Sequence, residues 1–340
     1  MSYMNSKQIV ITAEQVQGIS TEIKMECINT NIYYEDDKSL KDSFELTIDN
    51  IDYRTEILSE RGNKGANSII LKLYLADGYD TEDNVQRVLK VSKTPDNWTP
   101  TKGFSVPKFN RSFYREIECL QKCKELKVRN IIEIYSCGYI ICKKKNQKGK
   151  EVFIYFPFYM MECADYDLKQ FLENYDIDKE QKVALCKQLA SGLGELHNIG
   201  CYHRDIKPDN ILLINTELKI GDLGLIRYRD EDTEDAKGLI GPKGWISPEA
   251  MNKYLNEEKK FDGRINTEIN EQSDIFQLGM VFWYIFQGNA PIGCIKRTDF
   301  FDENEMIFSL IKRMIYHSTE KRIKSIGEVK DELSRILEKV

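Results

Sequence analysis

The segment from His203 to Asn210 reads HRDIKPDN, and it lies between a helix-periodic stretch and two short apolar runs. The tripeptides DLG, at 222–224, and SPE, at 247–249, follow it. They place the carboxylates of Asp205 and Asp222, the amide of Asn210 and the amine of Lys207 in loops next to predicted strands. Each tripeptide alone is compatible with an ordinary charged loop that stabilises a turn. Their order and spacing favour one shared site.

The chain before this segment is rich in short runs of β-branched and aromatic residues. Such runs extend from residue 50 to residue 161 and are interrupted by one helix-periodic stretch at 113–126. This pattern predicts a sheet with a single helix. The charged run 143–150 lies between two apolar runs, so it is interpreted as a solvated hairpin turn.

The chain after residue 168 is predicted to be mainly helical. Asp178 and Gln181 form a capping box, and apolar residues then recur at helical spacing up to Gly200. The apolar runs 211–214 and 218–220, connected by the residues NTE, predict a strand pair. The change in character near residues 163–167 predicts two lobes with a cleft between them.

Composition excludes several classes of protein. The 340 residues allow two or three domains, or one domain of two lobes, at roughly 100 to 200 residues per domain. The net charge of −6 provides no general attraction for nucleic acid or an anionic membrane. The nine cysteines form no CxxC pairs, and the longest apolar runs are shorter than the roughly 20 residues of a membrane helix. With no signal peptide in the sequence, we expect a cytoplasmic protein that binds neither nucleic acid nor membrane.

The three motifs resemble those of the eukaryotic-type protein kinase family, which has an HRD catalytic loop, a DFG motif and an APE motif. The resemblance covers roughly residues 53–337. It implies a bilobal α+β fold. Residues 51–162 form a small β-rich N-lobe with one helix, and residues 163–340 form a larger, mainly helical C-lobe. Residues 1–50 are then an N-terminal extension of unknown role, either a strand-bearing addition to the first lobe or a partly ordered arm.

The resemblance also implies a function, namely transfer of the γ-phosphate of ATP to Ser or Thr hydroxyls of protein substrates, with Mg²⁺. Asp205 is expected to accept the proton of the hydroxyl, and Lys207 to reach the transferred phosphoryl group. Asn210 and Asp222 are expected to bind the metal through oxygen atoms.

A lysine and a glutamate upstream match the phosphate-binding pair of the family. Lys90 lies in the predicted strand VLKV, at the position of the lysine in the family's VAIK motif. Glu116 lies in the helix-periodic stretch, at the position of the glutamate that pairs with that lysine. Glu118 is the competing candidate, and it lies about 200° further around the helix.

The resemblance assigns the remaining nucleotide contacts to the N-lobe and the connection between the lobes. In the glycine-rich loop, Gly65 is the only glycine retained, with Asn63 and Ser68 at the other two glycine positions. The residues expected to contact the adenosine part share an apolar or backbone character, apart from one acid expected at the ribose. They are Ile70, Val88 and Leu212 as apolar walls, Met161 as gatekeeper, the Glu162 carbonyl and Ala164 N–H at adenine, and Asp167 at the ribose.

Further matches concern the scaffold. Asp274 is expected to anchor the catalytic-loop backbone, and Arg322 to pair with Glu249, although a plain surface arginine is the alternative. A hydrophobic spine that joins the lobes is implied, and simple core packing would explain the same residues. Its members are Leu120, Ile134, His203 and Leu223.

Some alternatives remain open from the sequence. Pro242 stands where Ser/Thr kinases usually have a threonine, which leaves the choice of acceptor open. The stretch 250–273 is longer than is usual in the family and is interpreted as a solvated insertion. Arg204 is expected to bind either phosphorylated Thr233 or the carboxylates around it, and we favour the carboxylates.

Two other functions are compatible with parts of the sequence. A pseudokinase that only binds partners would explain the poor glycine-rich loop. A kinase-fold enzyme acting on a small molecule is a third possibility, but the SPE segment counts against it.

Overall fold

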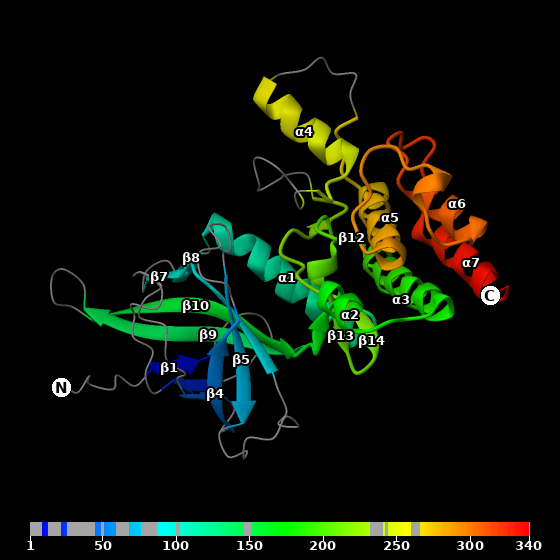
Figure 1. Cartoon of the computed structure of the whole chain (residues 1–340). Helices are drawn as coiled ribbons and strands as arrows, with labels where there is room; N and C mark the ends of the chain where they lie inside the picture. Colours follow the sequence, from blue (N-terminus) through cyan, green and yellow to red (C-terminus); the bar gives the residue numbers. More distant parts are fainter. Residues whose placement is uncertain are drawn as a thin grey trace. The chain divides into compact units, whose positions relative to one another are not determined.

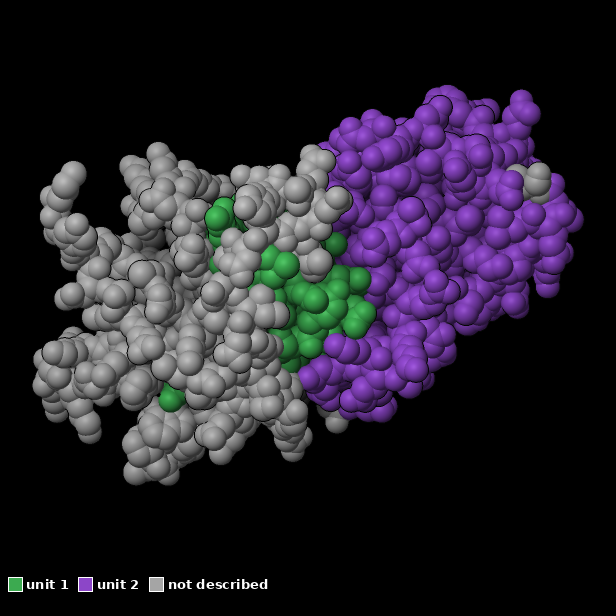
Figure 2. All heavy atoms as spheres, turned by 90° about the horizontal axis from the view of Figure 1, so that it is seen from below, with its two compact units in different colours: residues 1–117, 133–163 green, residues 118–132, 164–340 purple. Residues whose placement is uncertain are grey.

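The computed structural model describes residues 9–12, 22–25, 45–48, 51–58, 68–75, 87–99, 103–105, 107–145, 151–231, 241, 244–259 and 266–339. The chain divides into two compact units, which are coloured separately in Figure 2. Unit 1 comprises residues 1–117 and 133–163, and unit 2 comprises residues 118–132 and 164–340.

Unit 1 is built on an antiparallel sheet of eight strands in the order β1-β2-β3-β4-β5-β6-β10-β9 (Figure 1). The outermost strands of this order, β1 and β9, contact each other, so the sheet curls. The strands are β1 (Ile9–Thr12), β2 (Glu22–Met25), β3 (Glu45–Ile48), β4 (Ile51–Ile57), β5 (Ser68–Leu75), β6 (Arg87–Ser92), β9 (Ile134–Lys145) and β10 (Glu151–Glu162). A separate pair is formed by β7 (Asn97–Thr99) and β8 (Gly103–Ser105).

The strand-bearing alternative for residues 1–50 is confirmed, because they contribute β1, β2 and β3 to the sheet. One prediction about unit 1 needs correction. The charged run 143–150 is not entirely a turn, because Lys143–Lys145 complete β9 and pair with β10. Lys143, Lys144 and Lys145 follow one another within β9, so a run of charge did not mark the end of the strand.

Helix α1 (Lys108–Glu125) begins five residues before the predicted start at 113. Its first turn is fixed by a buried polar network, because Asn110 Nδ2 donates to Asp96 Oδ1 at 2.7 Å and Ser92 Oγ donates to Asn110 Oδ1 at 2.7 Å. Tyr114 on the next turn donates its hydroxyl to Asp96 Oδ2. These polar residues concealed the beginning of the helix, and they tie it to the sheet.

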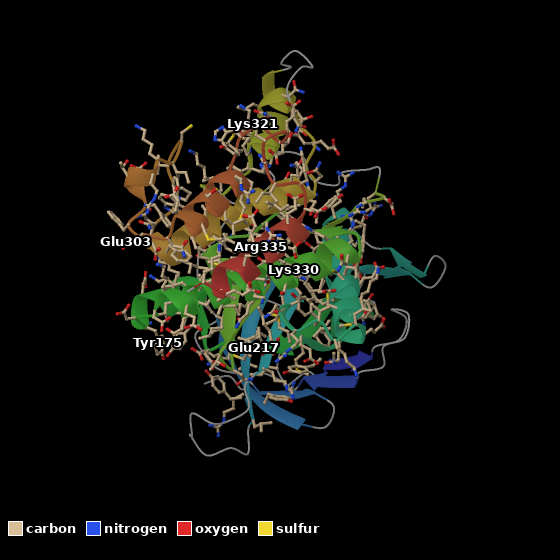
Figure 3. All side chains as sticks on the ribbon, turned by 90° about the vertical axis from the view of Figure 1, so that its right-hand side faces the viewer. Tyr175, Glu217, Glu303, Lys321, Lys330 and Arg335 are labelled. Carbon is tan, nitrogen blue, oxygen red and sulfur yellow. The ribbon has the colours of Figure 1, made fainter. Side chains whose placement is uncertain are left out.

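Unit 2 is mainly helical. Its core is α5, whose residues from Ser273 to Trp283 are all buried, and α6 packs so closely on α5 that a Cβ at Gly279 would lie 2.7 Å from Met314. The C-terminal helix α7 buries Val329 and Leu333 one turn apart, and it carries Lys330 and Arg335 on the side that faces the viewer in Figure 3. The helices are α2 (Leu168–Asn174), α3 (Lys179–Asn198), α4 (Pro248–Lys259), α5 (Glu271–Gln287), α6 (Glu305–Met314) and α7 (Ile326–Leu337).

The strands of unit 2 lie before and after the segment HRDIKPDN in the chain. They are β11 (Tyr166–Asp167), β12 (Cys201–Tyr202), β13 (Ile211–Ile214), β14 (Glu217–Ile220) and β15 (Arg227–Tyr228). The predicted β13–β14 hairpin is present with a shorter turn than NTE, because Asn215 and Thr216 alone form it with φ of 48° and 69°. Two residues in this left-handed region are typical of tight hairpins.

Two more predictions can be compared with the structure of unit 2. The capping box of Asp178 and Gln181 at the start of α3 is confirmed. The stretch after residue 250 is not a loop throughout, since α4 continues through it to Lys259. Among the described residues, no helix combines the length and apolar composition needed to cross a membrane.

Candidate active site

The catalytic loop HRDIKPDN is held by hydrogen bonds from its backbone to α5. The two carboxylate oxygens of Asp274 accept the N–H groups of His203 and Arg204, each at 2.8 Å. Gln277 Oε1 accepts the Ile206 N–H at 3.0 Å, and its Nε2 donates to the Arg204 carbonyl at 3.2 Å. Residues three apart share a helix face, so α5 presents both side chains to the loop. The anchoring expected of Asp274 is confirmed.

A buried histidine compensates the charge of Asp274. His197 Nε2 lies 3.0 Å from Asp274 Oδ2, and Nδ1 lies 3.4 Å from Glu271 Oε1. Burial acts to lower the pKa of His197, but the hydrogen bonds and charges of Asp274 and Glu271 outweigh it and raise that pKa to about 9. His197 is therefore a cation at neutral pH, and Asp274 has a counter-ion in the core.

Asp205 is buried and fixed by its neighbours in the loop. Asn210 Nδ2 donates to the Oδ2 and to the backbone carbonyl of Asp205, both at 2.8 Å, and Lys207 Nζ lies 3.5 Å from Oδ2. Burial raises the pKa of Asp205, the charges of Lys207 and His203 oppose the rise, and the charge of Asp222 adds to it. A fixed carboxylate with a raised pKa is suited to accept a proton from a hydroxyl.

The backbone is strained at two motif residues of unit 2. Arg204 has a φ of 72° and Asp222 a φ of 49°, a region that costs a non-glycine residue about 1–2 kcal/mol. His203 connects the two motifs, because its Nε2 lies 3.0 Å from the Gly221 carbonyl and its Nδ1 accepts the Asp205 N–H at 3.2 Å. The backbone strain therefore occurs at a residue of HRD and at a residue of DLG, the two motifs that His203 connects.

The segment that follows DLG is described as far as Glu231. The Arg227 guanidinium donates to the Glu231 carbonyl, and the Glu231 carboxylate accepts the Tyr228 N–H at 3.3 Å. These bonds fold the start of the segment back on itself after β15.

The charges of Arg204 and Arg227 act on a third cation, Lys253. Burial, followed by the charges of Arg204 and Arg227, lowers the pKa of Lys253 on α4. A group of like charges favours an anion among them. Thr233 and Pro242 lie outside the described residues, so phosphate and carboxylate both remain predictions for Arg204.

The pair of Glu249 and Arg322 is confirmed as a buried, two-pronged ion pair. Arg322 Nη1 lies 2.7 Å from Glu249 Oε1, and Nη2 lies 3.1 Å from Oε2. Ser273 Oγ also donates to Oε1 at 2.7 Å. Arg322 further donates to three backbone carbonyls, those of Gln272, Tyr316 and His317.

In unit 1, Lys90 pairs with Glu116. Lys90 Nζ lies 2.8 Å from Glu116 Oε1 and 3.0 Å from Oε2, and both residues are buried. Glu118, the competing candidate, is exposed. A second donor reaches the same carboxylate, because the Tyr159 hydroxyl donates to Glu116 Oε1 at 2.9 Å.

The strand register brings several predicted nucleotide contacts onto one face. Ile70 lies opposite Lys90, and Met161 lies opposite Val88. Val88 and Lys90 are two residues apart, so these four side chains share a face of the sheet. This arrangement suits an adenine slot, and the role of each residue remains a prediction.

The other predicted nucleotide contacts are less informative. Ser68 is the first residue of β5, whereas Gly65 and Asn63 lie outside the described residues. Leu212 in β13 is half-buried, and a Cβ at Gly221 would lie 3.0 Å from its Cδ1.

The predicted connection between the lobes includes two acids with structural tasks. Glu162 Oε1 accepts the Glu133 N–H at 2.7 Å, and the Glu162 N–H donates to the Glu133 carbonyl at 3.1 Å. Asp167 caps α2, where its Oδ1 accepts the Gln170 N–H at 2.7 Å. Contacts of Glu162 and Ala164 with adenine and of Asp167 with ribose remain predictions.

The four residues predicted to form a spine are all buried. Leu120, His203 and Leu223 have no exposure, and Ile134 has almost none. Their stacking remains a prediction.

A comparison with protein families gives the class. The family model for the protein kinase domain matches residues 79–340, well over half of the chain. The chain therefore belongs to the protein kinase domain family and has its bilobal α+β fold.

Relatives with curated names include several kinases. The chain is 29% identical over 231 residues to the serine/threonine-protein kinase cds1 of Schizosaccharomyces pombe, a match that covers 62% of this chain and 45% of the relative. It is 26% identical over 220 residues to a probable serine/threonine-protein kinase, ECU02_0550, of Encephalitozoon cuniculi, which covers 64% and 36%. It is also 26% identical over 144 residues to the mouse dual specificity protein kinase TTK, which covers 42% and 16%. The chain thus spans less than half the length of these relatives.

The sequence did not point to three residues of this site. Gln277 follows Asp274 by three residues, and that spacing could have indicated a second anchor on the same helix face. His197 precedes the catalytic loop on an apolar helix face, where a charge needs a buried partner. Tyr159 gave no signal, because its contact depends on the register between β6 and β10.

Proposed function

We propose that this chain is a protein kinase that uses ATP and Mg²⁺ to phosphorylate Ser or Thr hydroxyls of protein substrates. One observation carries the proposal. Asp205 is a buried carboxylate with a raised pKa, oriented by Asn210 and flanked by Lys207 and the charge of Asp222. This set of groups matches the needs of phosphoryl transfer.

Each residue of the loop has a distinct task in this reaction. Asp205 Oδ atoms orient the acceptor hydroxyl and take its proton as its oxygen bonds to the γ-phosphorus and the bond from that phosphorus to the leaving ADP oxygen breaks. Lys207 stabilises the negative charge on the transferred group, because its ammonium lies close to Asp205. Lys90, held by Glu116, binds phosphate oxygens of ATP.

The donor atoms suit Mg²⁺. Asp222 provides a carboxylate, and Asn210, which uses Nδ2 on Asp205, provides its amide oxygen. Hard oxygen donors are those that Mg²⁺ prefers. Asp222 also raises the pKa of Asp205, so these carboxylates repel one another, and a cation held by Asp222 would relieve that repulsion. When bound, the metal would neutralise charge on the phosphates.

The preference for Ser or Thr rests on the lysine in HRDIKPDN and on the names of the relatives. Lys207 two residues after Asp205 is typical of Ser/Thr kinases. The name of the mouse relative, a dual specificity kinase, shows that a related chain is not restricted to one acceptor class. We also propose a cytoplasmic location, because the nine cysteines show no spacing typical of a disulfide framework.

The test is a transfer assay with the purified chain, γ-labelled ATP, Mg²⁺ and a mixture of basic and acidic protein acceptors. We expect labelled phosphoserine and phosphothreonine. Label on tyrosine alone would overturn the acceptor class. ATP binding without any transfer would favour a pseudokinase, and label on small metabolites alone would favour a small-molecule phosphotransferase.

A further inference from the structure

Tyr159 lies beside the ion pair of unit 1. In the register of β6 and β10 it is directly opposite Lys90, so the two side chains project from the same face. Side chains in directly opposite positions are close neighbours, with Cβ atoms about 5 Å apart. Lys90 Nζ lies 5.7 Å from the centre of the Tyr159 ring, within the range of a cation–π contact.

The hydroxyl of Tyr159 completes the bonding of the Glu116 carboxylate. Glu116 is 1% exposed, so water contributes little to its solvation. Lys90 bonds to both carboxylate oxygens, and the Tyr159 hydroxyl adds a bond of 2.9 Å to Oε1. A carboxylate with donors on two sides is fixed in rotation, whereas one held by a flexible lysine alone can turn.

The ring of Tyr159 is itself immobilised. It is 1% exposed and packs against Phe113 at a centroid distance of 5.5 Å. Phe113 and Glu116 are three residues apart on α1 and so lie on one face of the helix. Tyr159 therefore contacts α1 twice, through its ring and through its hydroxyl, and it connects that helix face to the strand of the sheet that lies beside Lys90.

Packing alone does not account for a tyrosine at this place. A phenylalanine would fill the same volume and would spare the fold the desolvation of a hydroxyl. The hydroxyl is instead used on Glu116, an acid that pairs with Lys90. The hydrogen bond to Glu116 is therefore what a tyrosine provides at this position and a phenylalanine would not.

We propose that Tyr159 is a positioning residue for phosphate binding, which acts by holding Glu116 and thereby Lys90. This inference rests on the proposed function, because it assumes that Lys90 binds ATP. Tyr159 itself touches none of the reacting atoms. Removal of its hydroxyl should weaken the use of ATP and leave the protein acceptor's KM unchanged.

The test is a double-mutant cycle in the full chain with Tyr159→Phe, Glu116→Ala and both changes together. We expect Tyr159→Phe to lower kcat/KM for ATP about tenfold, or about 1.4 kcal/mol, in the otherwise wild-type chain. In the Glu116→Ala background the same change should have less than a twofold effect. An equal effect in both backgrounds, or none in the wild-type background, would overturn the proposal.

Tyr139→Phe is the matched control. Tyr139 is also buried, and its hydroxyl lies 2.8 Å from that of Tyr114 on α1, so it links the sheet to the same helix through Tyr114. We expect Tyr139→Phe to leave kcat/KM for ATP within twofold. If both variants lose activity equally, general anchoring of α1 is responsible and the specific role of Tyr159 is wrong.

Direct measurement of ATP affinity separates this inference from the proposed function. If the wild-type chain binds ATP but transfers no phosphate, the proposed function fails. The cycle is then read from the Kd for ATP, where Tyr159→Phe should again weaken binding only when Glu116 is present. Equal Kd values for wild type and Tyr159→Phe would contradict the inference.

Discussion

Two buried ion pairs, Lys90–Glu116 in unit 1 and Glu249–Arg322 in unit 2, combine the same charges in different surroundings. The Arg322 side chain has no exposure and donates to three backbone carbonyls in addition to Glu249. The Lys90 side chain retains 9% exposure and is a compact charge on a flexible stem. The side chain of Arg322 is thus completely buried, whereas that of Lys90 keeps some contact with solvent.

Similar distances within an ion pair therefore do not imply similar roles. The arginine pair joins α4 to the segment that precedes α7. The other N–H groups of Arg322 that form hydrogen bonds donate to backbone carbonyls of unit 2. The lysine pair holds a cation at a defined place on the sheet. Loss of the arginine pair should therefore reduce stability, and loss of the lysine pair should reduce activity.

The largest expected effect is on stability. Arg322→Ala should lower the free energy of unfolding by about 3–5 kcal/mol, because it leaves Glu249 buried without a counter-ion. Denaturant unfolding of the full chain measures this. The control is Arg129→Ala, which removes an exposed pair with Glu217 and should cost at most about 1 kcal/mol. Similar losses in the two variants would break the comparison.

The pair of His197 and Asp274 is a third buried ion pair, and its charge depends on pH because His197 can lose its proton. The pKa of His197 is raised to about 9 from 6.5, so its stabilising contribution is complete below about pH 6.5 and is lost as pH rises through 9. The free energy of unfolding should fall by about 3 kcal/mol across this window.

Two histidine variants check this assignment. His197→Gln should flatten the pH dependence of the free energy of unfolding between pH 6.5 and 9. His317→Gln alters an exposed histidine and should retain the slope. A wild-type chain whose stability is constant over this range would show that His197 carries no charge in the fold.

The smallest of these effects concerns the lysine pair and is measured as activity. Lys90→Met should lower kcat/KM for ATP about 100-fold, or about 2.7 kcal/mol, because a cation directed at phosphate is lost. Its effect on the free energy of unfolding should be smaller than that of Arg322→Ala, since the arginine variant also loses hydrogen bonds to three backbone carbonyls. Lys93→Met, at an exposed position three residues further along, should leave activity unchanged. Greater damage to stability than to activity in Lys90→Met would reverse the comparison.

Local signals in the sequence predicted much of unit 2. The capping box of α3 and the β13–β14 hairpin depend on residues within a few positions of each other, so the sequence alone indicates them. The motif resemblance added Asp205, Asn210 and Asp274, whose contacts are now visible. The end of α4 was missed, because mixed charges are typical of loops and of exposed helices alike.

Unit 1 was harder to predict, because its contacts connect distant strands. Tyr159 meets Glu116 only because β10 pairs with β6 in one register, and a shift of one residue would turn Tyr159 to the other face. The strands of the first fifty residues are short and separated by long segments, so alternation within them was too brief to recognise.

Asp205→Asn tests whether Asp205 accepts the proton of the substrate hydroxyl. An asparagine retains an oxygen for the hydrogen bond from Asn210, so the fold and the affinity for Mg·ATP should be maintained. We predict that kcat for phosphate transfer falls by about 10²- to 10⁴-fold in this variant, with an unchanged melting temperature. Transfer by the folded variant at the wild-type rate would contradict the account.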